Sequence, residues 1–194
     1  MRLYRASRVP LPMLPFMPYN HLPIGENAPH EVNAIIEIPR GSSNKYEYDA
    51  NLGVFKLDRP LYSPLFYPFD YGWIAGTLSA DGDPLDVLVI GSHPTFTGCV
   101  VAARPLGVLR MRDEKGDDEK VLARVVHDPR YHGVRRLAHV AEHILKEIEH
   151  FFDVYKTLEE KETQILGWQD VETAQQMVEH CRLLRQAEPR RPEQ

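Results

Sequence analysis

Short runs of strand-forming residues, separated by turn-forming residues, constrain the fold of this chain most. Seven such runs occupy residues 32–38, 45–48, 54–57, 85–90, 99–103, 107–111 and 121–126. Clusters of glycine, proline and aspartate lie between them, as they do between the strands of a sheet. The intervals leave no room for crossover helices, so we expect a mostly antiparallel sheet that closes into a barrel.

The last third of the chain has the spacing of helices instead. Apolar residues step by three and four from Leu137 to Ile148 and lead into Phe151-Phe152, which predicts an amphipathic helix. A second helix is predicted to begin after Asp170, its N-cap. The inward-facing residues of that helix would be Val171, Ala174, Met177, Cys181 and Leu184. The pattern therefore predicts an α+β fold, mainly β, in which two helices pack on a barrel.

Length and composition fit one globular domain. The chain has 194 residues, of which 43% are hydrophobic and 26% charged, and this is enough to bury a core without disulfides. We expect a proline-rich N-terminal arm over residues 1–20, a single domain over 21–187 and a loose C-terminal tail over 188–194. The two cysteines, Cys99 and Cys181, cannot build a disulfide framework, which favours a reducing, cytoplasmic location. No apolar run is long enough to span a membrane.

Carboxylates are concentrated in two clusters, DGDPLD at residues 81–86 and DEKGDDEK at 113–120. Gly82 and Pro84 favour a bent loop in which the three aspartates of the first cluster converge. Carboxylates this close repel one another unless a cation lies among them, and oxygen-only ligands suit Mg²⁺ or Mn²⁺ better than zinc. Solvated turns remain the alternative for either cluster alone, because Asp-Gly and Gly-Asp-Asp are common turn sequences.

Two other metal-site patterns are rejected. Residues 139–143 match the H-x-x-E-H pattern of some zinc proteases, but the apolar stripe accounts for the predicted helix, and we interpret the histidines as its solvated surface. An EF-hand is excluded because its sixth position, counted from Asp81, is Asp86 instead of glycine. Its twelfth position is Ser92 instead of glutamate.

Nine short motifs occur in one order along the chain. They are IEIP (36–39), NKYEYD (44–49), LDR (57–59), FYPFDYG (66–72), DGDPLDVLV (81–89), RPLGVL (104–109), MRDE (111–114), DEK (118–120) and FFDVYK (151–156). With these motifs, residues 21–186 strongly resemble the soluble family I inorganic pyrophosphatases. The resemblance implies an OB-like five-stranded antiparallel barrel with flanking α-helices. It also implies Mg²⁺-dependent hydrolysis of inorganic pyrophosphate to two phosphates, by a water that a metal cluster activates.

The resemblance implies roles for individual residues. Asp81, Asp86 and Asp118 match ligands of a first metal, and Asp86 is shared with a second. Asp113 and Asp118 match ligands of a further metal that arrives with the substrate. Asp83 matches the aspartate that holds and deprotonates the attacking water. The positions that match substrate-binding residues are Lys45, Glu47, Arg59, Tyr71, Lys120, Tyr155 and Lys156, and those that match supporting residues are Glu37 and Tyr67.

The resemblance also sets expectations for cofactors and partners. Several Mg²⁺ ions would bind per active site, with Mn²⁺ or another divalent ion as a substitute. Pyrophosphate would be the small-molecule substrate, with no nucleic-acid or membrane partner, and the chain would form a homohexamer as bacterial members do. A nucleic-acid-binding OB-type barrel is a rival hypothesis, but a net charge of −5 and acidic loops argue against it. A catalytically inactive relative is a second rival, but none of the five matched aspartates is lost.

Overall fold

The computed structural model describes residues 19–114 and 116–187. The predicted C-terminal tail and most of the predicted N-terminal arm lie outside this range, and the predicted division into arm, domain and tail stays a prediction. Tyr19, near the end of that arm, packs edge-on against Tyr48 and Phe55, and its hydroxyl donates to the Gly98 carbonyl at 2.9 Å. No helix in the described ranges is long and apolar enough to cross a bilayer.

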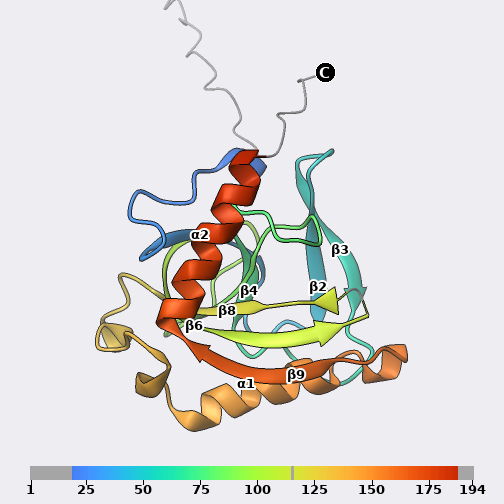
Figure 1. The fold of residues 1–194 in the computed structure, drawn as a ribbon. Coiled ribbons are helices and arrows are strands. Elements are labelled where there is room, and N and C mark those ends of the chain that lie inside the picture. Colours follow the sequence, from blue (N-terminus) through green and yellow to red (C-terminus); the bar gives the residue numbers. More distant parts are fainter. Residues whose placement is uncertain (1–18, 115, 188–194) are drawn as a thin grey trace, which may run out of the picture.

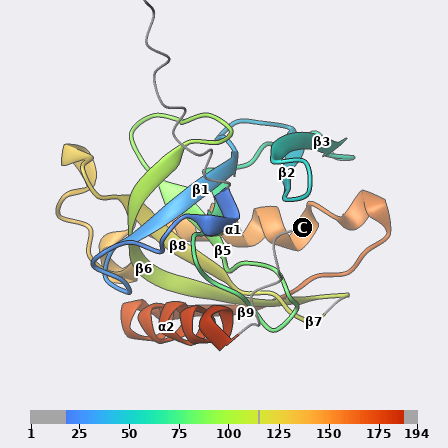
Figure 2. The same ribbon diagram turned by 90° about the horizontal axis from the view of Figure 1, so that it is seen from above.

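Within the described residues, five strands pair in a closed ring (Figures 1 and 2). The members of the ring are β1 (Val32–Ile38), β4 (Asp70–Ile74), β5 (Asp86–Ile90), β8 (Lys120–Val125) and β6 (Val100–Asp113). They pair in that order, and β6 returns to pair with β1. Four of the five pairings are antiparallel, and β5 runs parallel to β8. The predicted mainly β fold with an OB-like ring is therefore confirmed.

The remaining strands extend this ring or stand beside it. The two runs predicted at 99–103 and 107–111 form the single strand β6, whose register with β8 shifts between Pro105 and Gly107. The later half of β6 also pairs with β9 (Gln164–Asp170) and with the short β7 (Gly116–Asp117). Strands β2 (Asn44–Asp49) and β3 (Val54–Pro60) form a separate hairpin at one side of the ring (Figure 1). Neither β4 nor β9 was predicted.

Two α-helices of the described part flank the ring, α1 (Glu142–Val154) and α2 (Val171–Ala187). The prediction that the first helix begins at Leu137 is wrong: Leu137–His139 is a separate 3-10 turn (η3), and the backbone is extended at Val140. Leu137 lies tightly over Gly107 of β6, and its N–H is 3.4 Å from Asp170 Oδ1. This packing holds the segment to the sheet. The H-x-x-E-H histidines consequently do not share one helix.

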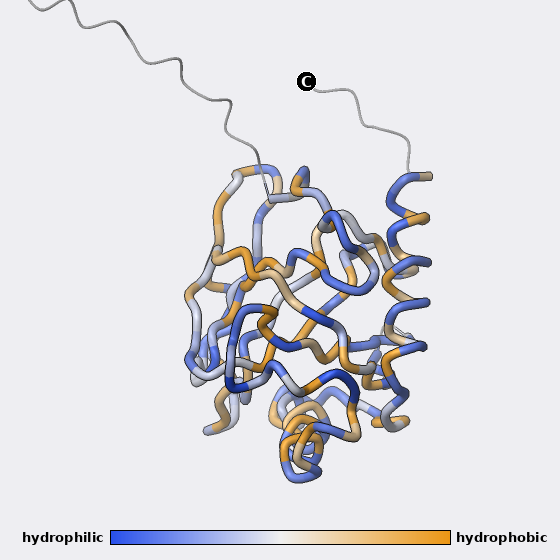
Figure 3. The backbone as a smooth tube through the Cα atoms, turned by 90° about the vertical axis from the view of Figure 1, so that its left-hand side faces the viewer, coloured by the Kyte–Doolittle hydropathy of each residue, from blue (hydrophilic) through white to orange (hydrophobic). Residues whose placement is uncertain are grey.

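Helix α2 begins directly after Asp170, as predicted, and Asp170 Oδ1 accepts the Val171 N–H at 2.8 Å. Hydrophilic and hydrophobic residues alternate along its coil (Figure 3). Its fully buried residues are Ala174, Val178 and Cys181. Val178 was not predicted to face inward, whereas Val171, Met177 and Leu184, which were, are only partly buried.

Side chains alternate along the ring strands between two apolar clusters. Leu88 of β5 and Leu122 of β8 join the cluster that contains Phe151 and Phe152 of α1. Their neighbours in sequence join the cluster that contains the buried face of α2. Asp86 and Lys120 begin β5 and β8 two residues before Leu88 and Leu122, so they lie on the α1 face of the sheet. The apolar cluster that contains Phe151 and Phe152 therefore ends at a pair of charged side chains, Asp86 and Lys120.

Candidate active site

One cleft of about 830 Å³ contains every residue that the sequence singled out for catalysis or binding. The matched aspartates among its lining residues are Asp81, Asp83, Asp86, Asp113 and Asp118. The other matched residues in the lining are Glu37, Lys45, Glu47, Arg59, Tyr67, Tyr71, Lys120, Tyr155 and Lys156. They come from segments more than 100 residues apart in the chain, and the ring, the β2–β3 hairpin and the end of α1 bring them together.

The loop before β5 is a tight turn that presents Asp81 and Asp83. The Asp83 N–H donates to Asp81 Oδ1 at 3.0 Å, and the Ser79 N–H donates to the Asp83 carbonyl at 2.7 Å. Gly82 supplies the positive φ of 91° that the turn requires. The Leu78 N–H donates to the carbonyl of Cys181 at 3.0 Å, which ties the loop to α2. The predicted bent loop is thus present, and all three of its aspartates line the cleft.

Lys120 lies at the centre of the carboxylates. Its Nζ donates to Asp86 Oδ2 and to Asp118 Oδ1, and its side chain is 3% exposed. Burial opposes the charge on Lys120, but the two carboxylates more than offset this and raise its pKa above the usual range. Burial also raises the pKa of Asp118, although Lys120 counteracts the shift. The Tyr71 hydroxyl donates to Asp86 Oδ2 at 2.5 Å.

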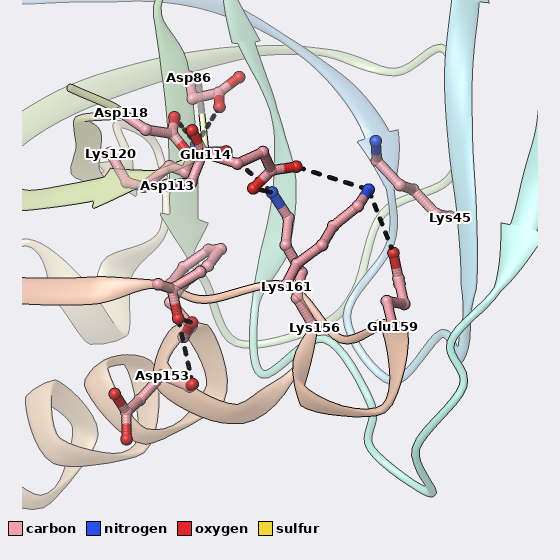
Figure 4. Close-up of polar contacts among 12 residues, drawn as sticks. Lys45, Asp86, Asp113, Glu114, Asp118, Lys120, Asp153, Lys156, Glu159 and Lys161 are labelled. Atoms are coloured by element: carbon pink, nitrogen blue, oxygen red, sulfur yellow. Dashed lines mark hydrogen bonds and ion pairs between the residues drawn. The ribbon is translucent and has the colours of Figure 1, made fainter. Parts of the chain in front are cut away.

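Lys156 holds a second group of carboxylates at the end of β6 (Figure 4). Its Nζ is 2.8 Å from Asp113 Oδ2 and 3.4 Å from Glu114 Oε2. Although burial disfavours its charge, nearby Tyr155 and the carboxylates raise the pKa of Lys156. Lys161 lies 3.5 Å from Glu114 Oε1 and 3.7 Å from Glu159 Oε2.

The β2–β3 hairpin supplies two cations to the cleft. The Lys45 Nζ is 2.5 Å from Glu47 Oε1 and 3.7 Å from Asp58 Oδ2. Arg59 pairs through Nη1 with Asp58, and its Nε and Nη2 donate to Glu159. The hairpin therefore places cationic groups beside the aspartate cluster.

Three further matched residues, Glu37, Tyr67 and Tyr155, line the cleft. The Glu37 carboxylate accepts the Tyr48 N–H at 2.8 Å, and burial raises the pKa of Glu37 to about 8. Burial raises the pKa of Tyr67 well above its usual value, and its ring centroid is 4.8 Å from that of Phe151. Burial also raises the pKa of Tyr155. Both tyrosines are therefore neutral hydrogen-bond donors near neutral pH.

Sequence reasoning gave no individual role to several charged residues of this site. The additional lining residues are Asp58, Glu114, Asp117, Glu119, Lys161 and Arg185. Glu159, which pairs with Arg59, was also missed. The acidic run at 113–120 signalled three of these residues, whereas nothing in the sequence places Arg185 of α2 or Glu159 beside residues so distant in the chain.

The cleft carries a large excess of negative charge. Among the described residues that line it, eleven are aspartate or glutamate and six are lysine or arginine. No three histidine, cysteine, aspartate or glutamate side chains of residues 19–114 and 116–187 form a ready-made metal site. The ammonium groups of Lys120 and Lys156 lie against Asp86, Asp118 and Asp113. The donor set still fits Mg²⁺, because it consists of carboxylate oxygens and the acidic residues of the cleft outnumber its basic residues by five.

Comparison with known proteins gives one consistent result. The family model described as inorganic pyrophosphatase matches residues 34–185. An inorganic pyrophosphatase of Nostoc sp. is 55% identical over 151 residues, which cover 78% of this chain and 89% of that protein. One of Halalkalibacterium halodurans is 52% identical over 153 residues, covering 79% and 94% of the two chains.

Solved structures agree with the sequence matches. The crystal structure of inorganic pyrophosphatase from Thermus thermophilus has a TM-score of 0.86 and 44% identity, and the match covers 88% of this chain and all of that one. The inorganic pyrophosphatase of Helicobacter pylori has a TM-score of 0.82 and 37% identity, with 86% and 99% covered. Residues 34–185, which the family model matches, include every residue that lines the cleft.

Proposed function

Because the chain belongs to the inorganic pyrophosphatase family and is an inorganic diphosphatase, we propose that its aspartate cluster hydrolyses pyrophosphate with Mg²⁺. The single observation that carries this proposal is the excess of carboxylates in the cleft. Pyrophosphate is a polyanion, and a cleft whose acidic residues outnumber its basic residues by eleven to six would repel it. Divalent cations reverse the sign of that interaction.

Four aspartates would hold the ions, namely Asp81, Asp86, Asp113 and Asp118. Bound Mg²⁺ would supply positive charge to the phosphoryl oxygens and lower the pKa of water. Mn²⁺ or another divalent ion that accepts oxygen ligands would be a substitute. Lys120 contacts both Asp86 and Asp118, so these two carboxylates are held close together.

The other residues would bind and orient the substrate. Lys45, Arg59 and Lys156 would contact phosphoryl oxygens with fixed positive charge, which favours the transition state of phosphoryl transfer. Tyr71 and Tyr155 would donate hydrogen bonds without adding charge. Asp83, which the turn presents at the edge of the cleft, would accept the proton of the attacking water.

A phosphate-release assay tests this proposal. The purified chain is assayed on pyrophosphate in Mg²⁺, in excess chelator, and after Mg²⁺ is restored. We expect phosphate release with Mg²⁺, loss of activity in chelator and recovery on restoration. Full turnover in excess chelator would overturn the metal-dependent mechanism.

We also propose that the chain forms a homohexamer in the cytoplasm, as the resemblance to bacterial pyrophosphatases implies. Exposed His150, near the end of α1, is available to a neighbouring subunit. Light scattering at micromolar concentration should give six times the 22.3 kDa mass of one chain. A monomer at that concentration would contradict the proposal.

A further inference from the structure

Glu159 forms a two-pronged ion pair with Arg59. It is the last residue of the 3-10 turn η4 (Thr157–Glu159), which follows α1. Arg59 Nε donates to Glu159 Oε1 at 2.9 Å, and Arg59 Nη2 donates to Glu159 Oε2 at 2.9 Å. The Glu159 side chain is only 7% exposed. This geometry fixes the plane of the guanidinium, which a single contact would not do.

The pair leaves part of the guanidinium for another ligand. A guanidinium has five N–H donors in a fixed fork. Glu159 accepts from Nε and Nη2, and Asp58 accepts from Nη1. One N–H on each terminal nitrogen is left, and Arg59 lines the cleft. Two N–H groups in that arrangement match the oxygens of one phosphoryl group.

The pair also connects two walls of the cleft. The β2–β3 hairpin is a separate two-stranded sheet, and it carries Lys45 and Arg59. Lys156 lies on the opposite segment, three residues before Glu159, and pairs with Asp113. Lys161, 3.7 Å from Glu159, lies between Glu159 and Glu114 (Figure 4). The Arg59–Glu159 pair therefore sets the spacing between cations that approach the substrate from the two walls.

We propose that Glu159 is a positioning residue that orients Arg59 for one phosphoryl group of the substrate. This inference rests on the proposed function, in which Arg59 contacts the substrate. Glu159 itself carries the same sign of charge as the substrate and acts through Arg59. Its removal therefore weakens substrate binding more than it slows the chemical step.

A double-mutant cycle separates this role from a general structural one. The four proteins are the unsubstituted chain, Glu159→Gln, Arg59→Ala and the double variant, all assayed on pyrophosphate at saturating Mg²⁺. We expect Glu159→Gln to raise KM about tenfold and to change kcat less than about threefold. In the Arg59→Ala background, the same substitution should change KM less than about twofold. Glu162→Gln, which removes an exposed carboxylate three residues away, is the matched control and should leave both constants unchanged.

The outcomes distinguish this inference from the proposed function. An equal rise in KM in both backgrounds would overturn the positioning role, because the effect would not pass through Arg59. An unchanged KM in Arg59→Ala would overturn it too, while Mg²⁺-dependent hydrolysis by the unsubstituted chain would leave the proposed function standing. If Glu159→Gln does not fold, Glu159→Asp replaces it in the cycle. Its KM should be raised, and that rise should disappear in the Arg59→Ala background.

Discussion

Asp83 and Asp86 lie three residues apart, but their surroundings differ. Asp86 begins β5 and is contacted by Lys120 and Tyr71, whereas Asp83 lies on the preceding turn. We expect Asp83→Asn to lower kcat by about 10²–10⁴, the usual contribution of a positioned base, with little change in Mg²⁺ affinity. Asp86→Asn should weaken Mg²⁺ binding instead. Metal titrations of kcat compare the two variants, and restoration of Asp83→Asn to the normal rate by added metal would contradict these roles.

Glu37 predicts a pH dependence of stability. Burial raises its pKa from 4.5 to about 8 in the folded chain. Between pH 4.5 and 8 the unfolded chain loses the Glu37 proton and the folded chain keeps it. The unfolding free energy therefore decreases as pH rises toward 8. Glu37→Gln keeps an acceptor for the Tyr48 N–H but does not titrate. Between pH 5 and 8.5 in chelator, the unfolding free energy of the unsubstituted chain should fall by at least about 1 kcal/mol more than that of the Glu37→Gln variant. An equal fall in unfolding free energy with pH for the two chains would contradict this prediction.

Single residues of the site were predictable to different degrees. The aspartates and their cationic neighbours belong to short motifs with distinctive composition, and every one lines the cleft. Glu159 has no such signal, because it stands in a stretch with other glutamates and its partner is 100 residues away. Its burial and its fork with Arg59 distinguish it from Glu160 and Glu162, and both properties depend on tertiary structure.

Among the elements, the pairing of β1 with β4 depends on a glycine. Gly72 lies opposite Ile36, and a Cβ at Gly72 would come within 1.8 Å of the Ile35 carbonyl oxygen. No side-chain rotation relieves a clash with backbone, so the strands would have to separate. We expect Gly72→Ala to lower the unfolding free energy by at least about 3 kcal/mol in denaturant titrations. Gly133→Ala, where a Cβ meets nothing within 4 Å, should stay within about 1 kcal/mol of the unsubstituted chain. Equal stability of the two variants would contradict this.

Strands β4 and β9 were not predicted from the sequence because contacts with distant parts of the chain, and not local residue preferences, form them. Strand β4 contains Asp70 and Gly72, residue types that strands disfavour, although every residue of β4 is buried. Asp70 is tolerated because its carboxylate accepts the backbone N–H groups of Arg40 and Thr95. Strand β9 contains Gly167 and exists through pairing with β6, more than 50 residues earlier. The start of α1 was predicted too early, because the 3-10 turn of η3 presents apolar residues at nearly helical spacing.

At the scale of the whole molecule, charge is distributed unevenly. The chain has 28 acidic and 23 basic side chains, and the described residues of the cleft account for eleven and six of them. The acidic and basic side chains outside this set therefore number seventeen each. The formal net charge of −5 for the chain equals the excess of acidic over basic residues in its cleft. Like charges gathered in one cleft destabilise the folded state, and unfolding separates them.

This distribution predicts that Mg²⁺ stabilises the folded chain. A ligand that binds only the folded state adds about 2.7 kcal/mol at 100 times its Kd, and 1 kcal/mol raises Tm by about 2–4 °C in a chain of this size. We therefore expect Mg²⁺ to raise Tm by at least about 5 °C over the chelated protein, as measured by thermal unfolding. NaCl at matched ionic strength controls for screening and should produce a much smaller rise. Asp86→Asn should lose most of the Mg²⁺ effect, because the substitution removes a carboxylate from the proposed ligand set. An equal rise in NaCl would show that screening, and not site binding, relieves the repulsion.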